Sequence, residues 1–547
     1  MSPFEVSVAV WVDLRLSERR RGIVRVVEPD SHADTFETGP ADAGAVQKRG
    51  RARHPWPSLS RPSYARALAA ITAAGALLRL AFLARQSIGY DEDFTALVLH
   101  QTPGHMMDIL SHDSAAPLFY LLAGLVTGIA NAAGLASFGG PGGPVALRLV
   151  PAAAGIALIP LIAALGRRIG GNSSGLWAAA FTAFAPATVW LSGFARMYGL
   201  AAALTVAASL LMWRAVERPT IGRWAAYSLV AAAAVWTHYL SILALAGILL
   251  AGLSLRPPRR VAASAFVATA AAVISIVPWL VAASAQLEHA GQGFWVEPLS
   301  PSLIGGTIAQ LVAGPPTGMD PPVALPLALL QAVAIAAALT AATAVAVSWR
   351  RHSQEWRRAS EFCLCAAAGA ALLAVVSVWR PLLDARYASL MWLPLFALAG
   401  AGLAALPRKL ALAAVVALLV PSVVISGLPT RAETSFLVPD VNAGVGPHDL
   451  VAVDQNHYMI LADQGTALVR ARLHVLTTGT PGWFVGTSAY APGTVIGVVP
   501  DDVPANGGRV FWVADPGASP PSLPAGYSAT TSRCVIGACL TVYVHAR

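Results

Sequence analysis

The stretch that decides the fold class is residues 145–165, which read VALRLVPAAAGIALIPLIAAL. It contains a single charged residue, Arg148. A helix of about 20 mainly apolar residues is long enough to cross the roughly 30 Å hydrocarbon core of a bilayer. We therefore expect this segment to span a membrane as a helix.

Comparable apolar runs continue on both sides of this segment. They cover residues 67–84, 116–134, 174–192, 198–214, 224–239, 241–255, 262–284, 323–348, 362–379, 387–405 and 409–427. The chain of 547 residues is 56% hydrophobic and 12% charged, whereas a soluble domain carries roughly 25% charged residues. One core cannot hold this apolar surplus, because cores stop growing near ~300 residues. The sequence therefore predicts an all-α polytopic membrane protein.

Basic residues between the runs predict the orientation, because basic loops stay on the cytoplasmic side. Five basic loops begin at Arg167, Arg214, Arg256, Arg350 and Arg408. All five are cytoplasmic if the run at 116–134 does not cross, so we expect a re-entrant or embedded helix within a large first outer loop, residues 85–144. About eleven transmembrane helices remain. The N-terminus is then cytoplasmic and the C-terminus lies outside.

The two ends of the chain differ from the apolar middle, residues 66–429. Residues 1–65 are polar and basic and have no signal-peptide-like run, so we expect a disordered cytoplasmic tail. Residues 430–547 have a soluble composition, with β-rich runs at 450–453, 494–499 and 509–513 and helical stretches near 456–471. We expect a small extracytoplasmic α/β domain. Cys534 and Cys539 form a local disulfide there or remain free, since spacing alone does not fix the geometry.

The predicted first outer loop carries an unusual concentration of acids and histidines. Residues 90–93 read YDED, and three adjacent acids repel one another, which raises a pKa or recruits a cation. One of them could act as a general base on a sugar hydroxyl, and a solvated loop cluster is the plain alternative. A metal site is the other option for this loop, although its potential ligands lack tight spacing: His100, His105, Asp108, His112 and Asp113.

Arginines near the predicted outer ends of the spans are candidates for anion binding. Arg79 lies inside the first run, where an arginine either serves a function or snorkels to the interface. Arg196 and Arg386 lie where the positive-inside bias makes basic residues rare, which favours contact with a phosphate. Aromatic side chains and a histidine accompany them, although aromatic residues at helix ends commonly mark the interface: Tyr198, His238, Tyr239, Trp295 and Tyr387.

Several functional classes lose support from the sequence. It contains no Walker loop, no GxGxxG motif after a strand and no HExxH motif, which argues against nucleotide-driven transport and zinc proteolysis. The net charge of +9 comes mostly from the short basic loops, so it reports topology and not a nucleic-acid partner. An outer acid with outer arginines favours chemistry on a lipid phosphate.

Taken in order, these motifs resemble the GT-C superfamily of membrane glycosyltransferases, in the family 39, protein O-mannosyltransferase-like or ArnT-like bacterial branch. The resemblance covers roughly residues 66–430. It is carried by LRL at 78–80, DE at 91–92, DSAAPLFY at 113–120, ALR at 146–148, SGFARMY at 192–198, THY at 237–239, FW at 294–295 and RY at 386–387.

The resemblance implies transfer of a sugar, mannose before a pentose, from a polyprenyl-phosphate donor at the outer face of a bacterial plasma membrane. The acceptor would be an envelope glycan, a glycolipid or a protein. Asp91 would be the general base with Glu92 in support, and Arg196 and Arg386, before Arg79, would stabilise the phosphate. The remaining substrate-binding residues would be Asp113, Tyr198, His238, Tyr239, Trp295 and Tyr387.

Two positions depart from the family pattern. Ala115-Ala116-Pro117 stands where members often have His-Pro-Pro, and Phe194 stands where many have an acid two residues before the arginine. The missing acid leaves open whether a divalent metal ion serves as cofactor. A transporter or flippase without covalent chemistry and an inactive scaffold are the alternatives. A transporter would place its acids within spans near the midplane, where this sequence has hardly any.

Overall fold

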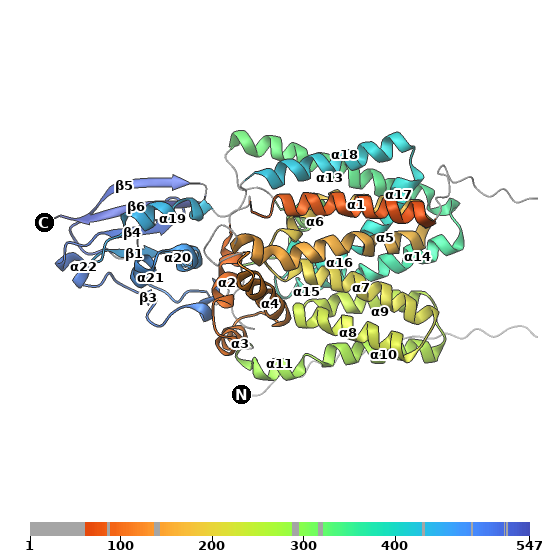
Figure 1. Ribbon diagram of the computed structural model, residues 1–547, viewed down its shortest axis with the longest axis horizontal. Coiled ribbons are helices and arrows are strands. Elements are labelled where there is room, and N and C mark those ends of the chain that lie inside the picture. Colours follow the sequence, from red (N-terminus) through yellow and green to blue (C-terminus); the bar gives the residue numbers. More distant parts are fainter. Residues whose placement is uncertain are drawn as a thin grey trace, which may run out of the picture. The chain divides into compact units, whose positions relative to one another are not determined.

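The computed structural model describes residues 61–84, 88–135, 143–286, 295–315, 321–428, 433–482, 485–518, 520, 523–535 and 537–546. The described residues up to 428 form a helix bundle, and a six-stranded sheet with short helices follows it (Figure 1). Most of the predicted basic tail, residues 1–60, lies outside the described residues. The first helix already begins at Arg61.

Most helices of the bundle coincide with predicted apolar runs, and three others lie in predicted outer loops, at residues 90–99, 103–112 and 301–313. They are α1 Arg61–Ala81, α2 Tyr90–Leu99, α3 Pro103–His112, α4 Leu118–Ala132, α5 Gly143–Phe184, α6 Pro186–Ser192, α7 Tyr198–Glu217, α8 Ile221–Thr237, α9 Ser241–Ser254, α10 Arg259–Ile274, α11 Val277–Ala282, α12 Pro301–Ala313, α13 Pro321–Ser348, α14 Gln354–Ala366, α15 Ala368–Val376, α16 Ala385–Trp392, α17 Pro394–Ala405 and α18 Arg408–Gly427.

Within the described residues, seven helices are long and apolar enough to cross a membrane. The pair α16 and α17, bent by 63°, makes an eighth. The prediction of a polytopic helical membrane protein is therefore confirmed. The predicted runs at 224–239 and 241–255 form α8 and α9, which have 17 and 14 residues and are short for a span. The count of about eleven crossings stays a prediction, as does the orientation.

Helix α5 consists of two antiparallel halves. Its backbone leaves helical geometry at Gly170 and Gly171, where φ at Gly171 is +72°. A Cβ added to Gly166 would lie 2.8 Å from the Cβ of Ala178, whereas twelve residues of continuous helix would separate them by about 18 Å. The chain therefore turns back at the glycine pair, as the separate runs at 145–165 and 174–192 predict.

The first loop folds into α2, α3 and α4 at the end of the bundle nearest the sheet (Figure 1). The apolar run at 116–134, which the sequence predicts not to cross the membrane, forms α4. This helix has 15 residues and is shorter than a membrane span. A cluster of buried side chains fixes this region to the bundle, including Phe94 of α2 and Phe119 and Tyr120 of α4. The described part of this loop, residues 88–135, thus packs as part of the bundle end.

Residues 433–546 form the mixed α/β domain that the sequence predicts. Its sheet has the order β3-β2-β1-β4-β6-β5, parallel from β3 to β4 and antiparallel from β4 to β5. All residues of β1 and β4 are buried, as central parallel strands require. The elements are β1 Leu450–Val453, β2 Leu473–Leu476, β3 Val495–Ile496, β4 Val510–Ala514, β5 Tyr527–Val535, β6 Ala538–His545, α19 Val438–Gly444, α20 Tyr458–Gln464, α21 Ala467–Arg472 and α22 Asp502–Ala505.

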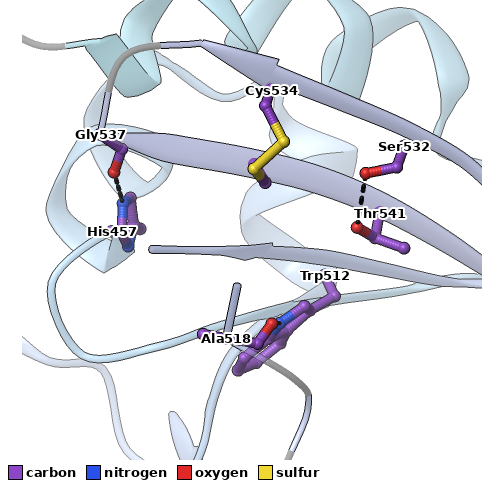
Figure 2. Close-up of a disulfide and its surroundings, with 8 residues drawn as sticks. His457, Trp512, Ala518, Ser532, Cys534, Gly537 and Thr541 are labelled. Atoms are coloured by element: carbon purple, nitrogen blue, oxygen red, sulfur yellow. Dashed lines mark hydrogen bonds between the residues drawn. A yellow bond between two sulfur atoms is a disulfide. The ribbon is translucent and has the colours of Figure 1, made fainter. Parts of the chain in front are cut away.

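A disulfide between Cys534 and Cys539 closes the β5–β6 hairpin (Figure 2). This settles the alternative that the sequence left open. Beside it, a ring nitrogen of His457 lies 3.4 Å from the carbonyl oxygen of Gly537 in the hairpin turn (Figure 2). The other two cysteines are free thiols, with Cys363 buried and Cys365 half-buried in α14.

Candidate functional site

Asp91 lies in the first turn of α2, between two arginines. Its Oδ2 accepts a hydrogen bond from Nη1 of Arg386 at 3.0 Å, and its Oδ1 lies 3.9 Å from Nη2 of Arg196. The Asp91 side chain is 35% exposed, so solvent or a substrate can reach the carboxylate. The structure thus brings together three predicted site residues that are far apart in the sequence: Asp91, Arg196 and Arg386.

Each arginine is fixed by further contacts. Nη1 of Arg196 donates to the hydroxyl of Tyr120 at 3.1 Å and to the backbone oxygen of Asp91 at 3.3 Å. The nearby carboxyl of Asp113 interacts electrostatically with Arg196 and Tyr120. Arg196 is therefore held against α2 from two sides, and it remains charged at any physiological pH.

Arg386 is oriented by its own helix start. Asp384 is the N-cap of α16, and its Oδ1 accepts from the backbone N–H of Arg386 at 2.8 Å and from Nε at 2.9 Å. The guanidinium also lies 4.3 Å over the ring of Trp295, within range of a cation–π contact. These contacts point Nη1 of Arg386 at Asp91.

Aromatic rings line the neighbourhood of this ion pair. The rings of Tyr198, His238 and Tyr387 lie 5.5 to 5.9 Å apart, and Trp295 is 6.5 Å from Tyr387. Phe194 stacks 6.0 Å from Tyr198, so an apolar ring occupies the position where the family pattern often has an acid. Five of the predicted substrate-binding residues therefore gather in one place: Arg386, Tyr198, His238, Trp295 and Tyr387.

Glu92 faces away from this neighbourhood. Its two oxygens accept from Nε and Nη2 of Arg148 at 2.8 and 2.7 Å, and both side chains are 1% exposed. Oε1 also accepts from the backbone N–H of Ala195 at 2.7 Å. Glu92 can therefore support Asp91 only by fixing the first turn of α2 to α5 and to the segment before α7. A direct role on substrate does not fit this geometry.

Arg79 is also a structural residue in this geometry. Its guanidinium donates to five acceptors at 2.9 to 3.2 Å, one in its own helix α1 and four around the break between α5 and α6: the backbone oxygen of Gly75, and Ser192 Oγ, Thr188 Oγ1 and the backbone oxygens of Thr182 and Ala183. A guanidinium has five N–H donors, so none is left for a phosphate. Buried helix-end carbonyls need such partners. The predicted phosphate contact of Arg79 does not fit.

The hydroxyl of Tyr239 is held by groups other than Arg196 and Arg386. It donates to the carbonyl of Ala115 at 3.2 Å and accepts from Nε1 of Trp279 at 2.8 Å. A further contact of 3.1 Å joins it to Oε1 of Gln286. Tyr239 thus ties the segment after α3 to α11, and its predicted substrate contact would have to break this network.

A cavity of about 230 Å³ lies beside Arg386, between α6, α12 and α16. Arg386, Asp384 and Gln310 supply its polar groups, and apolar side chains such as Leu311 and Trp190 form much of the rest. An apolar groove of about 850 Å³ between α12, α13 and α17 also has α12 as one wall. Helix α12 therefore lines both a polar-ended cavity and a long apolar groove.

The residues at Asp91 do not fit a divalent metal ion. Two guanidinium groups face the carboxylate, and they would repel a cation. The histidines of the first loop do not converge on it: His105 and His112 each lie 3.8 Å from the exposed Asp108, and His100 lies 3.7 Å from Asp463. Within the described residues, the one ligand group that could hold a metal is Asp454, His457 and Asp515, in the C-terminal domain.

Three residues of the site were not among the predicted site residues. Tyr120 and Asp384 contact the two arginines, and Arg148 pairs with Glu92. Arg148 carried a usable signal, because a lone charge in an apolar run requires a buried partner. Asp384 did as well, since an aspartate two residues before Arg386 is at N-cap spacing.

Comparison with known proteins gives the fold its context. No protein-family model matches the sequence, and no curated protein matches it. Among solved structures, it is similar to ArnT from Cupriavidus metallidurans in the apo state, with a TM-score of 0.57 and 13% identity, over 87% of this chain and 97% of that one. The same enzyme bound to undecaprenyl phosphate gives 0.57 and 14%, over 88% and 98%. This chain therefore shares the overall fold of the ArnT structures.

Proposed function

We propose that this chain transfers a sugar from a polyprenyl-phosphate-linked donor to a hydroxyl group of a cell-envelope acceptor. The observation that carries the proposal is the half-buried carboxylate of Asp91 between Arg386 and Arg196, beside a cavity with one polar end. The similar ArnT structure holds undecaprenyl phosphate, which supports a lipid phosphate as part of the donor. Mannose is the sugar we propose, with a pentose as the second choice.

The donor phosphate would bind Arg386. This residue lines the cavity between α6, α12 and α16, and its forked guanidinium suits two phosphate oxygens. The polyprenyl chain would extend from there along α12 into the apolar groove, where Ile308, Val312 and Leu339 offer only hydrocarbon. Arg196, fixed by Tyr120 and Asp91, would complete the positive field. The sugar would then lie among the aromatic rings.

Asp91 would act as the general base. Its carboxylate takes the proton of the acceptor hydroxyl, whose oxygen attacks the anomeric carbon as the bond from that carbon to the phosphate oxygen breaks. The polyprenyl phosphate leaves with the bonding electrons, and Arg386 stabilises the negative charge that develops. Before the donor binds, Arg386 neutralises Asp91. A bound phosphate would compete for the same guanidinium and so release the carboxylate for catalysis.

The location of the reaction is part of the proposal. We place the N-terminus in the cytoplasm of a bacterium, Asp91 at the outer face of the plasma membrane and residues 430–547 outside it, as the basic loops predict. Residues 66–429 would form the catalytic domain and residues 1–65 a cytoplasmic tail. The acceptor would be an envelope glycan, a glycolipid or a protein.

Membranes that contain the chain, supplied with radiolabelled polyprenyl-phospho-mannose and a crude envelope fraction, test the proposal. We expect label to pass from the lipid to the envelope fraction, and membranes that lack the chain to transfer none. A parallel reaction with a labelled pentose donor separates the two sugars. If neither donor loses its sugar while the chain is folded and abundant, the proposal fails and movement of the intact lipid across vesicles becomes the assay.

A further inference from the structure

A second acid of α2, Asp93, faces the C-terminal domain. It is fully buried, and its Oδ1 accepts a hydrogen bond from Nε2 of Gln464 in α20 at 2.9 Å. The neighbouring acid of α20, Asp463, interacts electrostatically with Asp93. Two carboxyl groups therefore meet where the helix that carries Asp91 packs against the soluble domain.

The burial of these two acids favours one proton on the pair. Ionised carboxylates are acceptors only, so two of them cannot hydrogen-bond each other. Oδ2 of Asp93 is buried and has no donor partner among the described residues, and the Asp463 side chain is only 7% exposed. Two negative charges buried side by side would repel each other and lose their hydration, whereas one proton held between them gives a charge-assisted hydrogen bond.

Other charges around the pair do not remove this requirement. Glu92, the preceding acid of α2, adds repulsion, although Arg148 neutralises it. On the other side, His100 lies 3.7 Å from Asp463, and Arg470 of α21 attracts Asp463 and disfavours a charge on His100. Burial raises the pKa of Asp463 to about 6 and, with the charge of Asp463, raises the pKa of Asp93 well above its ordinary value.

Asp93 lies two residues after Asp91 in helix α2. On the other side of Asp91, the hydroxyl of Tyr90 donates to the backbone oxygens of Gln455 and Val485, both in the C-terminal domain. Helix α2 is thus attached to that domain at both ends of its first turn. Loss of one attachment would let the turn shift, and a shift of about 1 Å at a reacting group can cost roughly a hundredfold in rate.

We propose that Asp93 and Asp463 share one proton, and that this protonated pair positions Asp91 by holding α2 against α20. Its effect on rate rests on the proposed transfer reaction, whereas its effect on the interface does not. The pair's contribution to the interface is fully present below the ordinary aspartate pKa and is lost as pH rises through the raised pKa of the folded pair. Transfer should therefore fall about tenfold per pH unit on that alkaline side.

Asparagine variants test the shared proton, because an amide can donate to the remaining carboxylate without a titrating proton. Asp93→Asn and Asp463→Asn should keep the transfer rate at high pH, with a higher ratio of kcat at pH 8.5 to kcat at pH 6 than wild type. Asp93→Ala should lower kcat at both pH values. Asp108→Asn, at an exposed acid of α3, is the control and should titrate as wild type does.

Hydrogen–deuterium exchange of α2 and α20 in the full-length protein, at pH 6 and 8.5 and corrected for intrinsic rates, tests the interface without catalysis. Wild type should lose amide protection at pH 8.5, and both asparagine variants should keep it. Equal pH dependence in wild type and both variants, or none in any, overturns the shared proton. If the exchange results are as predicted but no donor supports sugar transfer, the shared proton is supported and the proposed transfer function is rejected. If sugar is transferred but the exchange shows no pH effect, the function is supported and the shared proton is rejected.

Discussion

At the scale of single residues, Asp91 and the phosphate of the proposed donor would use the same guanidinium. The carboxylate of Asp91 accepts a hydrogen bond from Nη1 of Arg386. A phosphate that binds the same guanidinium would break this pair and leave the carboxylate free beside the sugar. Arg386 would thus both bind the leaving group and control when the base becomes available.

Changing Arg386 to Gln removes the positive charge and leaves a shorter, neutral polar side chain. We expect kcat to fall by roughly 10²–10³-fold, as for loss of one stabilising donor at a developing anion. Arg386→Lys keeps the positive charge but not the forked pair of donors, so its kcat should lie between those of wild type and Arg386→Gln. Steady-state transfer rates measure both. Arg260→Gln, at an exposed arginine at the start of α10, is the matched control, and an equal loss there would contradict the assignment.

Changing Glu92 to Gln leaves Arg148 buried beside a neutral group. Breaking one side of a buried ion pair costs about 3–5 kcal/mol, so we expect a lower unfolding temperature in detergent. The double variant Glu92→Leu/Arg148→Leu should regain part of the loss, because it leaves no uncompensated charge. If Glu92→Gln folds as stably as wild type but loses transfer, Glu92 acts on the substrate and the structural assignment is wrong.

The order of the motifs in the sequence singled out Asp91, Arg196 and Arg386 as site residues. It did not predict the directions in which the neighbouring side chains point. Successive residues on a helix lie about 100° apart, so Asp91 faces the site while Glu92 points into the bundle and Asp93 into the C-terminal domain. Arg79 has a similar explanation. Its partners are the backbone groups at the break between α5 and α6, and no pattern in the apolar runs predicts that break.

At the scale of elements, hydropathy predicted the helices well because each apolar run must be helical in lipid. It did not predict the β5–β6 hairpin. Strand β5 reads YSATTSRCV and is exposed along nearly its whole length, so it lacks the apolar alternation that marks a half-buried strand. The central strands β1 and β4, which are buried throughout, were predicted from continuous apolar runs.

Close packing of α17 on α5 depends on Gly400. A Cβ added there would lie 2.4 Å from the backbone nitrogen of Ala178, and backbone cannot yield to it. We expect Gly400→Ala to destabilise the bundle by about 1–3 kcal/mol, measured as a lower unfolding temperature in detergent. Gly222→Ala is the matched control, since nothing lies within 4 Å of its added Cβ. Equal stability of the two variants would contradict this packing.

At the scale of the whole molecule, the C-terminal domain takes part in the site through α2. Tyr90, Asp93 and Asp91 lie on one helical turn, two of them bonded to that domain and one to the arginines. Its composition predicted a separate soluble domain, and this contact was not foreseen. The reason is that the partners, Gln464 and Asp463, belong to an ordinary surface-like sequence until the fold buries them.

The stability of the C-terminal domain should depend on His457. Its Nδ1 lies 2.6 Å from Asp454, and these contacts raise the pKa of His457 and lower that of Asp454 despite their burial. The raised pKa stabilises the fold below the ordinary histidine value, and this contribution is lost as pH rises through the folded pKa.

Thermal unfolding between pH 6 and 8.5 measures this effect. We expect a decline for wild type and a smaller decline for His457→Gln. His474→Gln, at a half-buried histidine in β2 of the same domain, should behave as wild type does. An unchanged decline in His457→Gln would mean that another group titrates.

The most direct measurement of the central claim is sugar transfer by Asp91→Asn. Asparagine keeps the shape of the side chain but cannot accept a proton from the acceptor hydroxyl. At equal amounts of folded protein, we expect its transfer rate from labelled polyprenyl-phosphate sugar to fall by roughly 10²–10⁴-fold, while Asp108→Asn transfers as wild type does. Transfer by Asp91→Asn at the wild-type rate would contradict the account.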